Sequence, residues 1–471
     1  MSERAGVGDL ALVLHSHMPY VEGYGTYPFG EEWLFDAVIR SYVPVCERAE
    51  RLTMTVTPVL ADQLEADGVA ERLLEFCRRF RIESCEADAG DVGSELMGAC
   101  EAEAERYRAA LAHLAALDGD LLRLFSAPAA EGRVELLTSA ATHAVLPMLA
   151  TRQGRVLQID AGLRSHRRRF GACSGLWLPE CAYEPGLERL LAAHGVSYFC
   201  TDQSAHEPPT AALAPVATGA GPLAFTIDWE AVQWLWSLGG YPADPVFADF
   251  HRKSLRGARP WAIGGGPYDP DVAEARAREL GREFAAAAAR RLAGFAAERD
   301  RRGLLVFAID TELLGHWWWE GPAWLAEVIA AAEEHGIELV TLAQAAERHP
   351  GEERPLRRST WGERKDLSTW DSPAVADMAW AARRLELRVL RGVAGELPEA
   401  AAERAVRELL ALQASDWAFL DRRGQAGDYP WQRSTDHARA LLEAINSSAD
   451  APEARLRNLA PDLSLSPLLE P

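Results

Sequence analysis

Residues 10–19 read LALVLHSHMP, five consecutive apolar residues followed by a pair of histidines. A short apolar run of this kind is typical of a strand that is buried on both faces, as in a parallel sheet covered by helices. Seven more such runs occur, at residues 54–56, 134–137, 176–178, 198–200, 223–227, 304–309 and 337–342. Because helical segments lie between several of them, the sequence predicts an α/β protein with a parallel sheet.

Two regions interrupt the alternation of strands and helices, and a third ends it. Residues from about 63 to 130 indicate helices inserted after the second strand, and residues 271–300 indicate one amphipathic helix. After about residue 350 no strand pattern follows, and residues 374–391, 398–420 and 435–446 have helical periodicity. We therefore expect a catalytic α/β unit over residues 1–349, with its insertion, and an α-helical domain over residues 350–471, whose tail (450–471) we expect to be extended.

Charge and composition narrow the classes of function. The 471 residues include 49 basic and 70 acidic side chains, a formal net charge of −21. This balance argues against a nucleic-acid-binding protein, since affinity for phosphate backbones needs clustered positive charge. No apolar run approaches the roughly 20 residues of a membrane span. The N-terminus lacks signal-peptide features, and the seven cysteines form no CxxC pair, so we expect a reduced, cytoplasmic protein without a membrane partner.

Tryptophan is frequent in this chain, with 15 residues, and many of them stand beside polar or acidic residues. Flat indole rings next to carboxylates suit the binding of sugars, whereas tryptophan also serves simply to pack cores. The count alone leaves both interpretations open.

His15 and His17 follow the first apolar run and are separated by one residue. Side chains at positions i and i+2 of a strand point to the same face, so both imidazoles can enter one pocket. Such a pair could bind a metal ion, donate hydrogen bonds to sugar hydroxyls, or have only a structural role. Their spacing alone does not choose among these three interpretations.

Two carboxylates, Glu180 and Asp310, also follow predicted strands. A pair of acids at the carboxyl ends of barrel strands suggests glycosidic chemistry, with one acid as nucleophile and the other as general acid and base. In a retaining enzyme, the two carboxyl groups should lie about 5–5.5 Å apart. Trp317, Trp318 and Trp319 stand close behind Asp310, and three adjacent indoles cannot all face a core, so we expect some of them to line a cleft.

Four motifs in order make the sequence resemble glycoside hydrolase family 57, and within it the 1,4-α-glucan branching enzymes of the actinobacterial type. The resemblance covers most of the chain. The motifs are HSHMP (15–19), GRVEL (132–136) followed by His143, WLPECAY (177–183) and DTELLGHWW (310–318). The resemblance implies a distorted (β/α)7 TIM-like barrel with a helical insertion and a C-terminal helical domain that contributes to the substrate cleft. It also implies one strand fewer than the eight apolar runs.

The resemblance assigns roles to individual residues. Glu180 corresponds to the nucleophile and Asp310 to the general acid/base. The residues that the resemblance and the motifs place at the substrate are His15, His17, His143, Trp236, His316, Trp317, Trp361, Trp370, Asp416 and Trp417. The implied partner is an α-1,4-glucan such as amylose, glycogen or a modified glucan, and no metal or other cofactor is implied. Related zinc-dependent barrels have His-x-Asp at the first strand, whereas this chain has a histidine at position 17.

One segment departs from the pattern of the branching enzymes. These enzymes carry a tyrosine on a flexible loop after the nucleophile strand, and this chain has no tyrosine between Asp202 and Ile227. Residues 206–222, rich in proline, alanine and glycine, indicate a short and mobile loop. The primary expectation is a branching enzyme that acts with retention. The alternatives are an α-amylase, a 4-α-glucanotransferase, a metal-dependent hydrolase or deacetylase, and a non-catalytic carbohydrate-binding protein.

Overall fold

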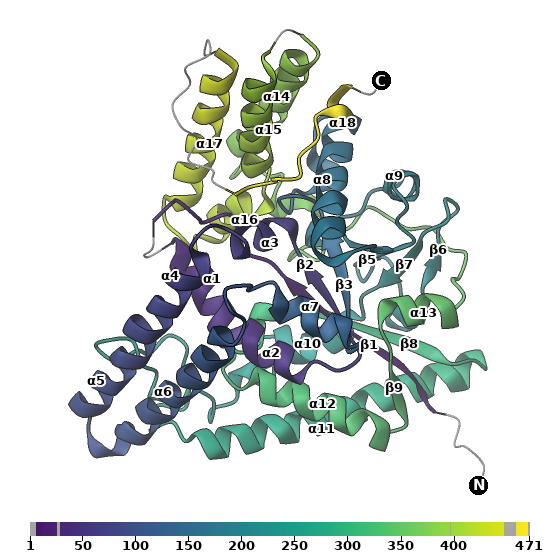
Figure 1. Ribbon diagram of the computed structural model, residues 1–471. Coiled ribbons are helices and arrows are strands. Elements are labelled where there is room, and N and C mark those ends of the chain that lie inside the picture. Colours follow the sequence, from purple (N-terminus) through teal and green to yellow (C-terminus); the bar gives the residue numbers. More distant parts are fainter. Residues whose placement is uncertain (1–5, 26–28, 396, 447–457, 470–471) are drawn as a thin grey trace.

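The structure, a computed structural model, describes residues 6–25, 29–395, 397–446 and 458–469. Its centre is a curled sheet surrounded by helices (Figure 1). Seven parallel strands form the continuous part of this sheet, in the spatial order β7-β5-β4-β3-β2-β1-β8. In chain order they are β1 (Gly8–Ser16), β2 (Leu52–Val56), β3 (Val134–Ser139), β4 (Gly175–Trp177), β5 (Tyr198–Thr201), β7 (Leu223–Thr226) and β8 (Gly303–Asp310).

Two further strands lie at the margins of this sheet. The last predicted run forms β9 (Ile337–Leu339), which pairs only with the first three residues of the described part of β1. All eight apolar runs therefore form strands, and β9 accounts for the one beyond the seven of the main sheet. The additional strand β6 (Val216–Ala217) pairs antiparallel with β7. Sequence analysis missed β6, because two residues carry no readable periodicity.

Strand β1 is the centre of the sheet. All nine of its residues are buried, and it pairs in parallel with β2 on one side and β8 on the other. The sheet curls far enough that its two ends approach each other, since the amide of Asp228, just after β7, donates to the carbonyl of Val306 in β8 at 2.9 Å. The predicted barrel is confirmed, in the form of a curled parallel sheet.

The connections around β2 are helical. Between β1 and β2 lie α1 (Glu31–Ala37), a π-helical turn η1 (Val38–Tyr42) and α2 (Val43–Arg48). Between β2 and β3 lie α3 (Pro58–Leu64), α4 (Val69–Phe76), the π-helical η2 (Cys77–Ile82), α5 (Glu83–Asp91), α6 (Ser94–Ala115) and α7 (Arg123–Ala130). The insertion predicted at about 63–130 coincides with this set, whose helices α4 to α6 extend to one side of the sheet (Figure 1).

The remaining crossovers are α8 (Arg152–Phe170), α9 (Leu187–Ala193), α10 (Trp229–Trp236), α11 (Pro270–Arg299), α12 (Gly321–Glu334) and α13 (Leu342–Arg348). The long helix α11 matches the predicted amphipathic helix. Its start is fixed by Asp269, whose side chain accepts from the amides of Asp271 and Val272, and by Pro270 in the first turn. Gly281 lets α11 approach α12 closely, because a Cβ there would lie 2.9 Å from the carbonyl oxygen of Trp324.

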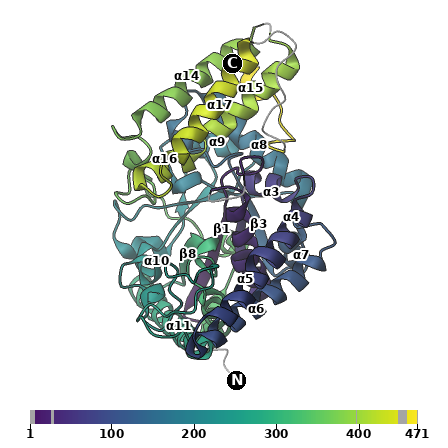
Figure 2. The same ribbon diagram turned by 90° about the vertical axis from the view of Figure 1, so that its left-hand side faces the viewer.

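The C-terminal helices lie at the end of the molecule away from the N-terminus (Figure 2). They are α14 (Ala376–Val393), α15 (Glu399–Leu412), α16 (Ser415–Arg423) and α17 (Tyr429–Asn446), close to the helical ranges predicted. One buried cluster joins Leu409 and Leu441 of these helices to Tyr20, Val59 and Leu157 of the preceding part. The helices therefore share a core with the elements around the sheet.

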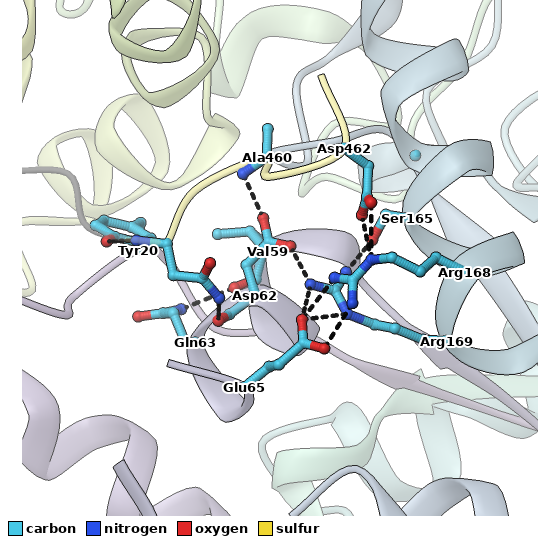
Figure 3. A network of polar contacts seen from close by, with 12 residues as sticks. Tyr20, Val59, Asp62, Gln63, Glu65, Ser165, Arg168, Arg169, Ala460 and Asp462 are labelled. Carbon is cyan, nitrogen blue, oxygen red and sulfur yellow. Dashed lines mark hydrogen bonds and ion pairs between the residues drawn. The ribbon is translucent and has the colours of Figure 1, made fainter. Parts of the chain in front are cut away.

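The described part of the tail, residues 458–469, returns to α3 and α8 and ends in the short helix α18 (Ser466–Leu469). Figure 3 shows the polar contacts that hold it. The amide of Ala460 donates to Asp62 at 2.7 Å, and the same carboxylate accepts from Arg169 at 2.8 Å. Arg168 forms an ion pair with Asp462. The tail was expected to be extended, and its described part instead ends in a helix; residues 447–457 lie outside the described residues. Within the described residues, no helix is both long and apolar enough to cross a membrane.

Candidate active site

Three histidines meet at the carboxyl ends of β1 and β3. His15 is the penultimate residue of β1 and stands opposite Asp310 of β8 in the parallel ladder. His143 follows β3 with a φ of 59°, in the left-handed region that non-glycine residues rarely adopt. The Nε2 atoms of His15 and His143 are 2.9 Å apart, and the rings of His17 and His143 stack at 4.1 Å.

The three imidazoles differ in charge. Burial holds the pKa of His15 and of His143 well below the usual value, and the proximity of His17 lowers both further. Burial also opposes a charge on His17, but the carboxylates of Asp416 and Glu312 outweigh it and raise its pKa. His17 Nε2 donates to Asp416 at 3.1 Å. The cluster thus combines one imidazole whose surroundings favour the charged form with two whose surroundings favour the neutral form.

Glu180 lies directly behind β4, in the 3₁₀ turn η4 (Pro179–Cys181), with a φ of 59°. This strained conformation positions its carboxylate beside His143, whose Nδ1 is 3.6 Å from Oε1. The indole N–H of Trp361 donates to Oε2 at 2.9 Å. Burial raises the pKa of Glu180, while hydrogen bonds from Trp361 and Ser415 oppose that rise.

Asp310 is the last residue of β8, and its side chain enters the same group of carboxylates. Burial, together with the negative charges of Glu312 and Glu180, raises the pKa of Asp310 well above the usual value for a carboxylic acid. Burial raises the pKa of both acids, and that of Asp310 well above its usual value, so Asp310 is the acid that favours the protonated form. A general acid must hold a proton and a nucleophile must be ionised, so the two roles require two acids of different proton affinity at one site.

The distance between the carboxyl groups of Glu180 and Asp310, expected at about 5–5.5 Å, stays a prediction. Intermediate contacts connect the two residues. His15, the ladder partner of Asp310, has its ring 4.7 Å from that of Trp177 and 6.2 Å from that of Trp361, whose N–H binds Glu180.

Several side chains that sequence analysis did not select support this cluster. Glu312 accepts from the amide of His17 at 3.1 Å and from the hydroxyl of Tyr42, and burial raises the pKa of Glu312 to about 7. Thr57 Oγ1 is 3.1 Å from His17 Nδ1, and Ser415 Oγ is 2.9 Å from His143 Nδ1. For Glu312, the sequence did contain a signal, namely its position two residues after Asp310. Thr57 and Tyr42 had none.

The structure brings together His15, His17, His143, Glu180, Asp310, Trp361 and Asp416. His316 has different surroundings, since its ring is 5.9 Å from that of Phe250 and burial together with Arg40 lowers its pKa to about 3. The expected place of His316 near the cleaved bond is therefore not supported by its contacts. In the described residues no group of three or more histidine, cysteine or acidic side chains has the geometry of a metal site.

The predicted sugar-binding tryptophans differ in exposure. Trp236 and Trp317 are each 53% exposed, Trp318 is buried, and Trp319 packs between the guanidinium groups of Arg40 and Arg106. As expected, the three adjacent indoles do not all face a core.

Trp370 and Trp417 are each only 2% exposed. Trp370 packs with Val145 and Ala182, and the indole N–H of Trp417 donates to the carbonyl of Ala411 at 2.8 Å. In this conformation both rings pack in the interior behind the site, and their contact with sugar stays a prediction.

Comparison with known proteins agrees with this arrangement. Residues 11–222 match the model of glycosyl hydrolase family 57, and residues 377–465 match the model of the C-terminal part of 1,4-alpha-glucan branching enzymes. A 1,4-alpha-glucan branching enzyme of Thermococcus kodakarensis is 33% identical, over 93% of this chain and 73% of that protein.

Two solved structures are similar over nearly the whole chain. A family 57 branching enzyme of Thermococcus kodakaraensis, solved with glucose, has a TM-score of 0.90 and 29% identity, covering 98% of this chain and 96% of the other. An α-amylase of Thermotoga maritima has a TM-score of 0.82 and 25% identity, covering 93% of each chain. The sequence similarity to the Thermococcus kodakarensis enzyme, the matching family models and the shared fold agree. This chain therefore belongs to glycosyl hydrolase family 57.

Proposed function

We propose that this chain is a retaining α-glucan transglycosylase, a 1,4-α-glucan branching enzyme that cleaves α-1,4 bonds and forms α-1,6 bonds. The observation that carries the proposal is the pair Glu180 and Asp310. These two acids lie beside the histidine cluster and differ in their affinity for a proton. The match of the C-terminal helices to the branching-enzyme domain, and the curated relative, favour transfer to a glucan.

The two acids would act in two displacements. In the first, the Glu180 carboxylate forms a bond to the anomeric carbon while Asp310 gives its proton to the glycosidic oxygen, and the cleaved chain leaves as an alcohol. In the second, the ionised Asp310 removes the proton of the incoming 6-hydroxyl, whose oxygen attacks the anomeric carbon and releases Glu180. Two inversions at the same carbon give net retention.

The histidines fit a role in holding sugar hydroxyls close to the reacting bond. Neutral His15 and His143 can each donate one hydrogen bond and accept another, whereas the charged form of His17, which its raised pKa favours, donates only. The positive charge of His17 also lowers the pKa of Glu180 and of Asp310, and so favours their ionised forms. It therefore supports Glu180 as the nucleophile and moderates the high proton affinity of Asp310.

Hydrolysis is the second candidate, since the similar Thermotoga maritima structure is named an α-amylase. The segment without the tyrosine also favours it. Residues 206–222 were expected to be mobile, but Arg354 donates to the carbonyls of Ala211 and Ala214 at 2.7 and 2.8 Å, and Arg291 donates to that of Pro209 at 2.8 Å. We expect a short segment anchored in this way to leave the cleft more open to water.

A product analysis tests the two candidates. Amylose is incubated with the protein, and the product is then treated with isoamylase, which cuts α-1,6 branches. We expect new short chains after debranching and few new reducing ends before it, with Glu180→Gln as the background control. Reducing ends that accumulate without new short chains would reject branching in favour of hydrolysis.

The cellular compartment is part of the same proposal. All seven cysteines are free and six of them are buried, as suits a reducing cytoplasm. The expected substrate is an α-1,4-glucan such as amylose, glycogen or a modified glucan.

A further inference from the structure

A second group of charged side chains lies outside the histidine cluster, beneath the loop that follows β8. Its centre is Arg40, in the π-helical turn η1, which is only 3% exposed. Two of its guanidinium nitrogens, Nε and Nη1, are buried without a hydrogen-bond partner in the part of the chain that the structure describes. A buried guanidinium is costly unless an anion or several acceptors compensate its charge.

The acids near Arg40 are already engaged by other cations. Asp36 accepts two hydrogen bonds from Arg81, one of them at 2.7 Å from Nε. Glu103 accepts from the amide of Arg259 at 2.7 Å, from its guanidinium at 3.4 Å, and from the hydroxyl of Tyr107. The face of the Arg40 guanidinium lies over the ring of Trp319, 4.8 Å from its centre, which gives a weaker compensation than a carboxylate. Among the described residues, Asp36 and Glu103 are thus the acids whose charges act on Arg40, and each of them is already bound to another arginine.

Three more nitrogen-bearing side chains gather around Phe250. The guanidinium of Arg259 and the ammonium of Lys253 lie 5.1 and 6.0 Å from the centre of this ring, and the imidazole of His316 lies 5.9 Å from it. Burial, followed by repulsion from Arg259, lowers the pKa of both Arg40 and Lys253, so these cations lie within range of one another. In a protein with a net charge of −21, such a convergence of cations is not an effect of composition.

The edge of this group is exposed and aromatic. Trp317 is 53% exposed, and its ring lies 4.8 Å from that of Phe250 and 5.0 Å from that of His316. An exposed indole beside a cationic floor offers a flat surface to a sugar ring and hydrogen-bond donors to an oxyanion. His316 remains neutral at physiological pH, so it can accept a hydrogen bond from a hydroxyl or donate one to an oxyanion.

We propose that Arg40, Arg259, Lys253 and His316 form a binding site for a phosphate monoester, with Trp317 beside it as a platform for the attached sugar. Guanidinium groups bind phosphate oxygens with paired N–H donors, and a doubly charged oxyanion suits three converging cations better than a single carboxylate does. The phosphate part of this inference is independent of the proposed function, whereas the sugar part rests on it. The ligand is either a free sugar phosphate or a phosphate group carried on the glucan chain.

Binding measurements test the phosphate site without reference to catalysis. Inorganic phosphate, glucose 6-phosphate and glucose are titrated into the full-length protein by calorimetry, with sodium chloride added to hold the ionic strength constant. We expect both phosphates to bind and glucose to bind far more weakly. Arg40→Met should weaken phosphate binding at least tenfold, and Lys253→Met, a change at an exposed position that does not threaten the fold, should weaken it severalfold.

The matched control is Arg78→Met on η2, which also removes one cation, but at an exposed position in the insertion. It should leave the affinity for phosphate unchanged. The proposal is overturned if neither phosphate binds the wild-type protein, or if Lys253→Met and Arg40→Met bind phosphate as tightly as Arg78→Met does.

A second measurement distinguishes the sources of the phosphate. The rate of cleavage of a phosphorylated maltodextrin is compared with that of the same dextrin without phosphate, in wild type and in Lys253→Met. A wild-type preference that disappears in the variant assigns the site to phosphate on the glucan. Equal rates together with tight binding of glucose 6-phosphate assign it to a free sugar phosphate. Phosphate binding by a protein that does not cleave either dextrin would contradict the proposed function and leave the phosphate site standing.

Discussion

The indole N–H of Trp361 donates to Oε2 of Glu180 at 2.9 Å, and the backbone amide of the same tryptophan donates to the Glu180 carbonyl at 3.0 Å. The side chain and the backbone of one residue are thus both fixed by a segment 181 positions later in the chain. Because Glu180 has a left-handed conformation that costs free energy, these contacts help to maintain it. The segment before the C-terminal helices therefore belongs to the catalytic site as much as the strands do.

Trp361→Phe should reduce activity and shift its pH dependence. A hydrogen bond to a carboxylate favours the charged form, so its removal raises the pKa of Glu180, which burial already holds high. The nucleophile is then protonated at a higher pH, and the acidic limb of the profile of kcat/KM against pH moves upward. The loss of one hydrogen bond to a charged group is worth about 1.5–3 kcal/mol, or roughly 10–100-fold in rate. A lower rate with an unmoved acidic limb would show that Trp361 acts only by contact with sugar.

Glu180→Gln and Asp310→Asn should each lower turnover of amylose by several orders of magnitude, for different reasons that one substrate separates. Fluoride leaves without protonation, so α-maltosyl fluoride should remain a substrate for Asp310→Asn but not for Glu180→Gln. Release of fluoride ion measures the reaction directly. If Glu180→Gln releases fluoride and Asp310→Asn does not, the two roles are exchanged.

The strands and the acids that follow them were predictable, because a buried parallel strand is a continuous apolar run and its end is marked by the first polar residues. His15 and Asp310 therefore came from a local pattern, and the ladder sets them side by side. Trp361 and Asp416 were expected at the site only through the family resemblance, since no local pattern states which distant segment will close on a strand end.

His316 shows the opposite case, in which a motif suggests a position that the contacts do not support. It belongs to the same stretch as Asp310, yet its side chain lies near Phe250 and in the field of Arg40. The reason is the turn between them, where Gly315 has a φ of 98° and a Cβ would collide with the carbonyl of Arg40. A glycine that allows this close approach places the residues after it beside η1. The sequence shows the glycine but not the direction of the turn.

Glu312→Gln should lower the pH at which activity falls on the alkaline side. The negative charge of Glu312 stabilises the protonated form of Asp310 and so contributes to the high pKa of that acid. An amide removes this charge while keeping an oxygen that can accept from the amide of His17. The pKa of Asp310 then falls, the general acid loses its proton at lower pH, and the alkaline limb of kcat/KM moves down. The profile is measured over the same range for both proteins, and an alkaline limb that stays in place would show that Glu312 does not set the acidity of Asp310.

Glu386→Ala should destabilise the contact between the C-terminal helices and α8. The carboxylate of Glu386 on α14 is buried and accepts from the amides of Ala150 and Thr151 at 3.0 and 2.8 Å, and from the side chain of Gln413 at 3.1 Å. Alanine leaves these donors buried and unpaired, at a cost of about 1–3 kcal/mol for each that finds no other partner. We expect the midpoint of thermal unfolding to fall by several degrees, while the exposed control Glu399→Ala leaves it unchanged. Equal midpoints for the two variants would contradict this role of Glu386. The C-terminal helices also hold Asp416 beside His17. The Glu386 variant should therefore lose activity at temperatures below its own unfolding midpoint.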